Sequence, residues 1–161
     1  MLKRITVGLL GLLLLVAAPA WSAKLAPTTE ALVKVLGNYG YSYKEMRNNQ
    51  AIFTRQQSVV AITLNAKGLV SAGGVSIGPK ADVDATLGAL HIIYTALQVN
   101  RGKTQVLNNQ VAMAKMSKLI DAVDAALKAS SETQFRFEDM NVKATRNDKT
   151  QYLTIGLSPR A

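Results

Sequence analysis

The spacing of apolar and polar residues predicts a short helix followed by strands. Pro27 and the early carboxylate of Glu30 are typical of a helix start, because proline suits the first turn and a negative charge suits the positive helix end. Asn38 and Gly40 would end this helix, since both tolerate the left-handed conformation of a C-terminal cap. From Tyr41 onward apolar and polar residues alternate, which is the period of a strand with one buried face.

The alternating pattern predicts an N-terminal meander of three or four strands. Its clearest strand is Ser58–Leu64, and a turn at residues 65–68 leads to a weaker strand, 69–77, which Gly73 and Gly74 interrupt. The C-terminal part repeats this style as hairpins. The other strands are expected at residues 41–44, 51–55, 135–138, 142–146 and 151–157, with turns at Asn48 and Asn49 and at residues 147–150.

Between these strands the apolar residues recur every three or four positions, which predicts two long helices. The first, from about Val83 to the break at residues 100–102, has only a narrow polar stripe and should be mostly buried. The second is expected over about 103–129, and the short break implies an antiparallel hairpin. The predicted fold is α+β: an antiparallel sheet, made of the meander and the C-terminal hairpins, covered on one face by this helix pair, with a short N-terminal helix.

The first residues predict export. Lys3 and Arg4 precede an apolar run, residues 5–16, which ends in small residues, as in a secretory signal peptide. The run is shorter than the ~20 residues that a membrane span needs. We therefore expect cleavage between Ala20 and Ala23, with residues 1–23 as signal peptide and residues 24–161 as one α+β domain of a periplasmic or secreted protein without a stable membrane span.

Composition excludes several chemistries. The chain has no cysteine, which rules out disulfides, thiolate nucleophiles and cysteine zinc sites. We expect no metal and no cofactor, and the sequence carries no nucleic-acid-binding motif. The net charge is +9, and loss of Lys3 and Arg4 lowers it to +7. In an exported protein this excess suits an anionic envelope component or an acidic partner, or simply solubility.

The sequence contains residues for two kinds of candidate catalytic site. Residues 74–78 match the G-x-S-x-G nucleophile elbow around Ser76, between a strand and a helix. A serine nucleophile needs a base, and the only histidine is His91, which lies about 15 Å along the following helix, out of easy reach. A glycine-rich connection is the simpler interpretation. A carboxylate pair from residues 121 and 124, or 138 and 139, is the other possibility, although solvated surface charges are the simpler interpretation of these acids.

Two groups of residues could bind a partner. Tyr39, Tyr41 and Tyr43 alternate, so in an extended segment they would face one way, either as a binding surface or as the core edge of the sheet. The basic residues cluster on the first hairpin and after Met140. If these hairpins are neighbours in the sheet, its open face is cationic. The basic binding residues expected from this clustering are Arg47, Arg55, Lys143, Arg146 and Lys149.

These features predict an exported, non-enzymatic binding or accessory protein that engages a protein partner or an anionic cell-envelope component through a basic sheet face. Because catalytic groups are scarce, an enzyme is a weaker hypothesis than a binding protein. The alternative is a small envelope hydrolase that uses Ser76 or a carboxylate pair.

Overall fold

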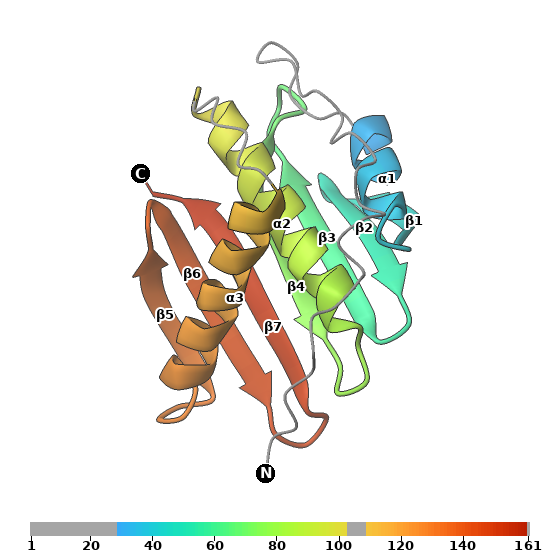
Figure 1. Ribbon diagram of the computed structural model, residues 1–161. Coiled ribbons are helices and arrows are strands. Elements are labelled where there is room, and N and C mark those ends of the chain that lie inside the picture. Colours follow the sequence, from blue (N-terminus) through green and yellow to red (C-terminus); the bar gives the residue numbers. More distant parts are fainter. Residues whose placement is uncertain (1–28, 103–108, 161) are drawn as a thin grey trace.

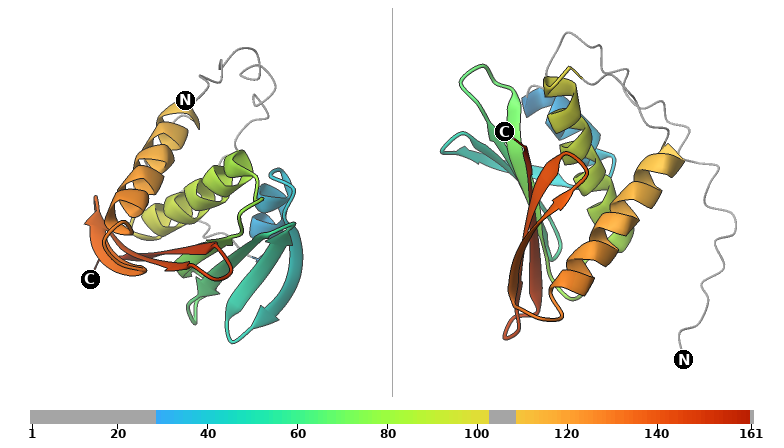
Figure 2. Two further views of the ribbon diagram at one scale, coloured as in Figure 1. Left: turned by 90° about the horizontal axis from the view of Figure 1, so that it is seen from below. Right: turned by 90° about the vertical axis from the view of Figure 1, so that its left-hand side faces the viewer.

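The computed structural model describes residues 29–102 and 109–160, and these residues confirm the predicted α+β fold. Seven antiparallel strands form one sheet in the order β1-β2-β3-β4-β7-β6-β5. Within these described ranges, three helices lie on one side of the sheet and leave its other side, here called the open face, without helical cover (Figures 1 and 2). The expected signal peptide and its cleavage site lie outside the described residues.

The N-terminal meander contains four strands, and its last strand is more regular than the sequence predicts. These are β1 (Ser42–Arg47), β2 (Gln50–Arg55), β3 (Ser58–Leu64) and β4 (Val70–Ile77). Asn48 and Asn49 make the predicted turn with φ angles of 49° and 61°, a left-handed conformation that asparagine tolerates. The predicted interruption of this strand at Gly73 and Gly74 was wrong. Strand β4 runs through Gly73 and Gly74 without a break and pairs with a neighbour on each side, near the centre of the sheet.

The C-terminal strands complete the sheet by pairing with the meander. They are β5 (Glu132–Phe137), β6 (Met140–Asn147) and β7 (Tyr152–Pro159), and β7 pairs with β4. Glu138, expected in a strand, lies instead in the β5–β6 turn with a φ of 54°. Because β3 and β4 separate the β1–β2 hairpin from β7 and β6, the two basic hairpins are not neighbours. The condition for one continuous cationic face is therefore not met.

The helices cover the sheet in the predicted order. They are α1 (Thr29–Gly37), α2 (Val83–Asn100) and α3 (Asn109–Ala126). The expected start of the last helix, residues 103–108, lies outside the described residues. The side chain of Asp82 caps α2 by accepting a hydrogen bond of 3.1 Å from the backbone N–H of Ala85. Helix α2 lies against the middle of the sheet, and α3 runs back in the opposite sense beside it (Figure 2).

Helix α2 is mostly buried, as its narrow polar stripe predicts. Leu90, Ile93 and Leu97 are fully buried among core residues that come from the sheet and from all three helices. At Gly73 the helix comes close to β4, since a Cβ there would lie 2.8 Å from the Cγ2 atom of Ile93. The glycine that weakens β4 in the sequence therefore allows close packing of the helix on the sheet.

Candidate functional site

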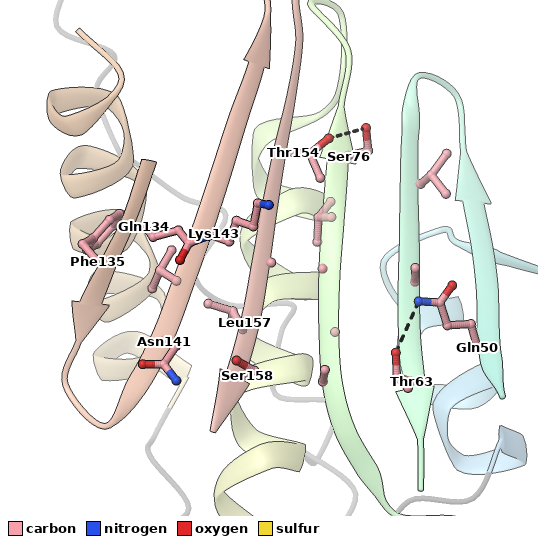
Figure 3. Close-up of a pocket in the computed structure, with 18 of the residues that line it drawn as sticks. Gln50, Thr63, Ser76, Gln134, Phe135, Asn141, Lys143, Thr154, Leu157 and Ser158 are labelled. Atoms are coloured by element: carbon pink, nitrogen blue, oxygen red, sulfur yellow. Dashed lines mark hydrogen bonds between the residues drawn. The ribbon is translucent and has the colours of Figure 1, made fainter. Parts of the chain in front are cut away.

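The open face carries a groove with a floor of very small residues. Strand register places Ala61, Gly74 and Gly156 side by side across β3, β4 and β7. Their neighbours along each strand face the helices, as the fully buried Val60, Val75 and Ile155 do. The groove has a volume of about 910 Å³, within the usual range for small-ligand sites (Figure 3).

Hydroxyl and amide groups line this groove around the small floor. The Thr154 hydroxyl donates a hydrogen bond of 3.1 Å to the Ser76 hydroxyl, and the Gln50 amide donates one of 3.3 Å to Thr63 (Figure 3). Further polar groups come from Gln134, Asn141 and Ser158. Such side chains can both donate and accept, so the groove suits a polar ligand body.

The charged lining residues of the groove are basic, and they stand on one side of it. Lys143 on β6 and Arg136 on β5 line it, and among the described lining residues there is no aspartate or glutamate. Lys143 forms an ion pair of 2.8 Å with Glu132, but both side chains are more than half exposed, so this pair is weak. The guanidinium of Arg136 has no hydrogen bond or ion pair within the described part of the chain.

Ser76 does not form a nucleophile elbow. It lies within the regular strand β4, paired with Val59 and Thr154, and it faces the open side of the sheet. His91 belongs to α2, which covers the opposite face, and burial lowers the pKa of its imidazole. The sheet therefore stands between the expected nucleophile and the expected base. The described residues bring no other histidine or carboxylate against Ser76.

The expected carboxylate pair Glu138 and Asp139 forms a structural clamp. Glu138 accepts a hydrogen bond of 2.6 Å from the Tyr94 hydroxyl and another of 2.9 Å from Lys115. Asp139 accepts a hydrogen bond of 2.7 Å from Gln98, so the β5–β6 turn is tied to α2 and α3. The other expected pair lies on the exposed side of α3. In the described ranges, no three histidine, aspartate or glutamate side chains gather as a metal site would require.

This clamp shifts the pKa values of its members. Burial alone would raise the pKa of Glu138, but the hydrogen bonds from Tyr94 and Lys115 and the charge of Lys115 outweigh it and lower that pKa. Burial, followed by the nearby Glu138 carboxylate, raises the pKa of Tyr94. The Tyr94 hydroxyl therefore stays protonated and donates its hydrogen to Glu138.

The lowered pKa of Glu138 predicts acid sensitivity of the fold. A carboxylate whose pKa is lower in the folded than in the unfolded chain stabilises the fold above its ordinary pKa of 4.5, and this stabilisation is lost as the pH falls through the folded value. Glu138→Gln should therefore unfold more easily than wild type at pH 7 and lose less stability on acidification. Urea unfolding at pH 7 and at acidic pH measures both. An identical pH dependence in the two proteins would contradict the clamp.

The three tyrosines that the sequence places on one side of an extended segment do not form one exposed surface. Tyr41 is buried, and its hydroxyl lies 2.7 Å from that of Ser58. Tyr43 is partly exposed and packs edge-on against Phe53 with ring centroids 5.5 Å apart. Tyr39 precedes the strand and packs against α2, where burial raises its pKa. Tyr41 thus belongs to the core, and none of the three lines the groove.

Most of the predicted basic residues lie away from the groove. Arg55 pairs with Asp82 at 2.7 Å and also bonds the carbonyl of Tyr39. Arg146 bonds the Leu127 carbonyl at 3.0 Å, on the helix side, and pairs with Asp148. Arg47 and Lys149 are exposed at the ends of their hairpins. Lys143 is the one residue of the predicted binding set that lines the groove.

Sequence reasoning missed most of the groove. Gln134, Arg136 and Asn141 are among its unpredicted polar members, and its floor depends on Gly74 and Gly156. The alternation of Gln134 and Arg136 with the apolar Phe135 and Phe137 was a signal that could have placed both on the open face. The adjacency of Gly74 and Gly156 had no local signal, because it depends on pairing between strands 82 residues apart.

Fold and site together define a two-layer α+β domain with a polar groove on its open sheet face. Comparisons with protein-family models, with curated proteins and with solved structures find no match. Over the described part of the chain, no helix combines the length and the apolar character needed to cross a membrane.

Proposed function

We propose that this chain is an exported, non-enzymatic binding protein that holds an anionic envelope component or an acidic partner in the groove on its open face. The observation that carries this proposal is the charge of the groove: Arg136 and Lys143 line it, and no described lining residue is acidic. A cationic groove in a protein outside the cytoplasm attracts the anions available there. The export signal predicted from residues 1–23 supports that location.

The hydrolase alternative has less support. Ser76 has Thr154 as its hydrogen-bond partner, and a hydroxyl of this kind does not act as a general base at neutral pH. The expected carboxylates Glu138 and Asp139 bond Tyr94, Lys115 and Gln98. These contacts favour a binding role over a catalytic one.

Charge reversal in the groove tests the proposal. At about 0.15 M salt, retention of the double variant Arg136→Glu/Lys143→Glu, expressed with its leader, on isolated envelope fractions should fall at least about tenfold, because charge-assisted contacts contribute about 1.5–3 kcal/mol each. A matched control is Lys67→Glu/Lys149→Glu, which makes the same change of charge at two exposed turn positions outside the groove.

The control should keep retention within about twofold of wild type, since exposed charges away from the contact are screened by salt. Equal losses in both double variants would show that total charge, and not the groove, determines retention. Undiminished retention in the groove variant would rule out the proposed function.

A further inference from the structure

Four side chains on β5 and β6 form a cluster of hydrogen-bond donors at one side of the groove. Gln134 stands opposite Lys143, and Arg136 stands opposite Asn141. Residues directly opposite in an antiparallel pair have Cβ atoms about 4.5–5.5 Å apart, and diagonal neighbours about 7–8 Å. The two cations therefore lie on one diagonal and the two amides on the other. We call this group the β5–β6 quartet.

The quartet has the chemistry of an oxyanion site. The Arg136 guanidinium offers paired N–H groups that match the two oxygens of a carboxylate or phosphate. The Lys143 ammonium has three N–H groups, so its ion pair with Glu132 leaves two for a ligand. Gln134 and Asn141 each add an amide NH₂, and the Asn141 amide has only a long contact of 3.4 Å with the Pro159 carbonyl.

The charge of the groove is confined to this side. The opposite side is lined by Gln50, Val59 and Thr63, none of which is charged. A linear polyanion repeats its charges along its length and would leave most of them without a cation here. With a volume of about 910 Å³, the groove instead suits a compact molecule with one anionic group and an uncharged polar body.

The groups that line the groove favour a saccharide over a peptide as the uncharged polar part of the ligand. A peptide strand gains main-chain hydrogen bonds at the edge of a sheet, whereas the groove lies over β3, β4 and β7, whose backbone groups already pair with each other. Sugar hydroxyls require side-chain donors and acceptors, which Ser76, Thr154 and Ser158 supply. The floor at Gly74 and Gly156 lets such a body lie close to the sheet.

We propose that the groove binds a saccharide that carries a single oxyanion, with the carboxylate or phosphate on the β5–β6 quartet and the sugar over the glycine floor. This inference rests on the proposed binding function and names its ligand class. The shared chemistry is the oxyanion on a hydroxylated body, whether the oxyanion is a uronic acid carboxylate or a phosphate ester.

Calorimetric titration of the exported, purified chain tests this ligand class. The probes are glucose 6-phosphate and glucuronate, with glucose as the uncharged half, inorganic phosphate and acetate as the matching anionic halves, and polyglutamate as a polyanion. At least one of the two anionic sugars should bind at least tenfold more tightly than glucose and than its own anionic half. It should also bind more tightly than polyglutamate, with both affinities expressed per binding site. The preferred anionic sugar identifies the source as phosphate ester or carboxylate.

Two variants connect binding to the groove. Arg136→Gln should weaken binding of the preferred sugar at least tenfold by removing one cation. Gly156→Val should do the same by filling the floor, because a Cβ at this position meets only the Lys143 carbonyl, at 3.7 Å. Thr145→Val, on the same face but outside the groove lining, is the matched control and should bind as wild type does.

Each of the following results would overturn the inference. Equal binding of inorganic phosphate and glucose 6-phosphate would show that the sugar body is not recognised. Tighter binding of polyglutamate would indicate an acidic protein as the ligand. If no sugar binds while envelope retention still depends on Arg136 and Lys143, the saccharide inference fails and the proposed function remains. If retention does not depend on these residues, the proposed function itself fails.

Discussion

Gly88→Ala is expected to destabilise the fold by about 1–3 kcal/mol, although alanine is the better helix former. Gly88 lies in the second turn of α2, and a Cβ there would lie 2.1 Å from the Cε1 atom of Tyr39 and 2.6 Å from Cζ. The ring therefore packs directly against the helix backbone. Alanine gains about 1 kcal/mol in helix propensity over glycine, which the displacement of a packed ring exceeds. Urea unfolding measures the net effect.

A second variant separates these two contributions. In a Tyr39→Ala background the ring is absent, so Gly88→Ala should change sign and stabilise the fold by up to about 1 kcal/mol. The bond from Arg55 to the Tyr39 carbonyl is unaffected, because it uses the main chain. The same destabilisation in both backgrounds would show that the Tyr39 ring is not what requires glycine at this position.

Gly74→Ala is the second substitution with a large expected effect, a loss of about 1–3 kcal/mol. A Cβ at position 74 would lie 2.7 Å from the Ile155 carbonyl oxygen and 3.2 Å from the Gly156 Cα. Both atoms belong to the main chain of β7, so no side-chain rotation can make room. The central β4–β7 pair would have to move apart, which should appear as a lower midpoint in thermal and urea unfolding.

The cross-strand partner of Gly74 provides the control. Gly156→Ala places a Cβ at an ordinary contact distance of 3.7 Å, and alanine loses less backbone entropy than glycine on folding. It should therefore be neutral or stabilise the fold by up to about 1 kcal/mol. Equal destabilisation by both substitutions would show that the sheet centre rejects any side chain, and Gly156 variants could then no longer report on the groove alone.

The strands and helices could be predicted because their signals are local. The alternation along Ser58–Leu64 and the three- and four-residue spacing of α2 reflect which side of each element is buried. The unbroken course of β4 through Gly73 and Gly74 could not be predicted, because glycine weakens an isolated strand. Its benefit depends on Ile93 of α2, which packs where a side chain at Gly73 would stand.

The binding residues were harder to predict, because their arrangement depends on distant pairing. Alternation placed three tyrosines on one line, yet Tyr39 precedes the strand and Tyr41 enters the core. Charge clustering indicated Arg146, whose guanidinium bonds the Leu127 carbonyl on the helix side. Lys143 was found because clustering and strand position agree there. Arg136 was missed because a single cation between aromatic residues belongs to no cluster.

By itself, the sequence determined the α+β class, the meander, the helix pair and the absence of cysteine chemistry, since each follows from nearby residues or from composition. The tertiary structure alone decided that β4 pairs with β7. That pairing separates the basic hairpins, joins Gly74 to Gly156 and places the β5–β6 quartet at the side of their groove. The physical reason is that the order of strands in a sheet comes from long-range hydrogen bonding and helix packing, which no short stretch of sequence encodes.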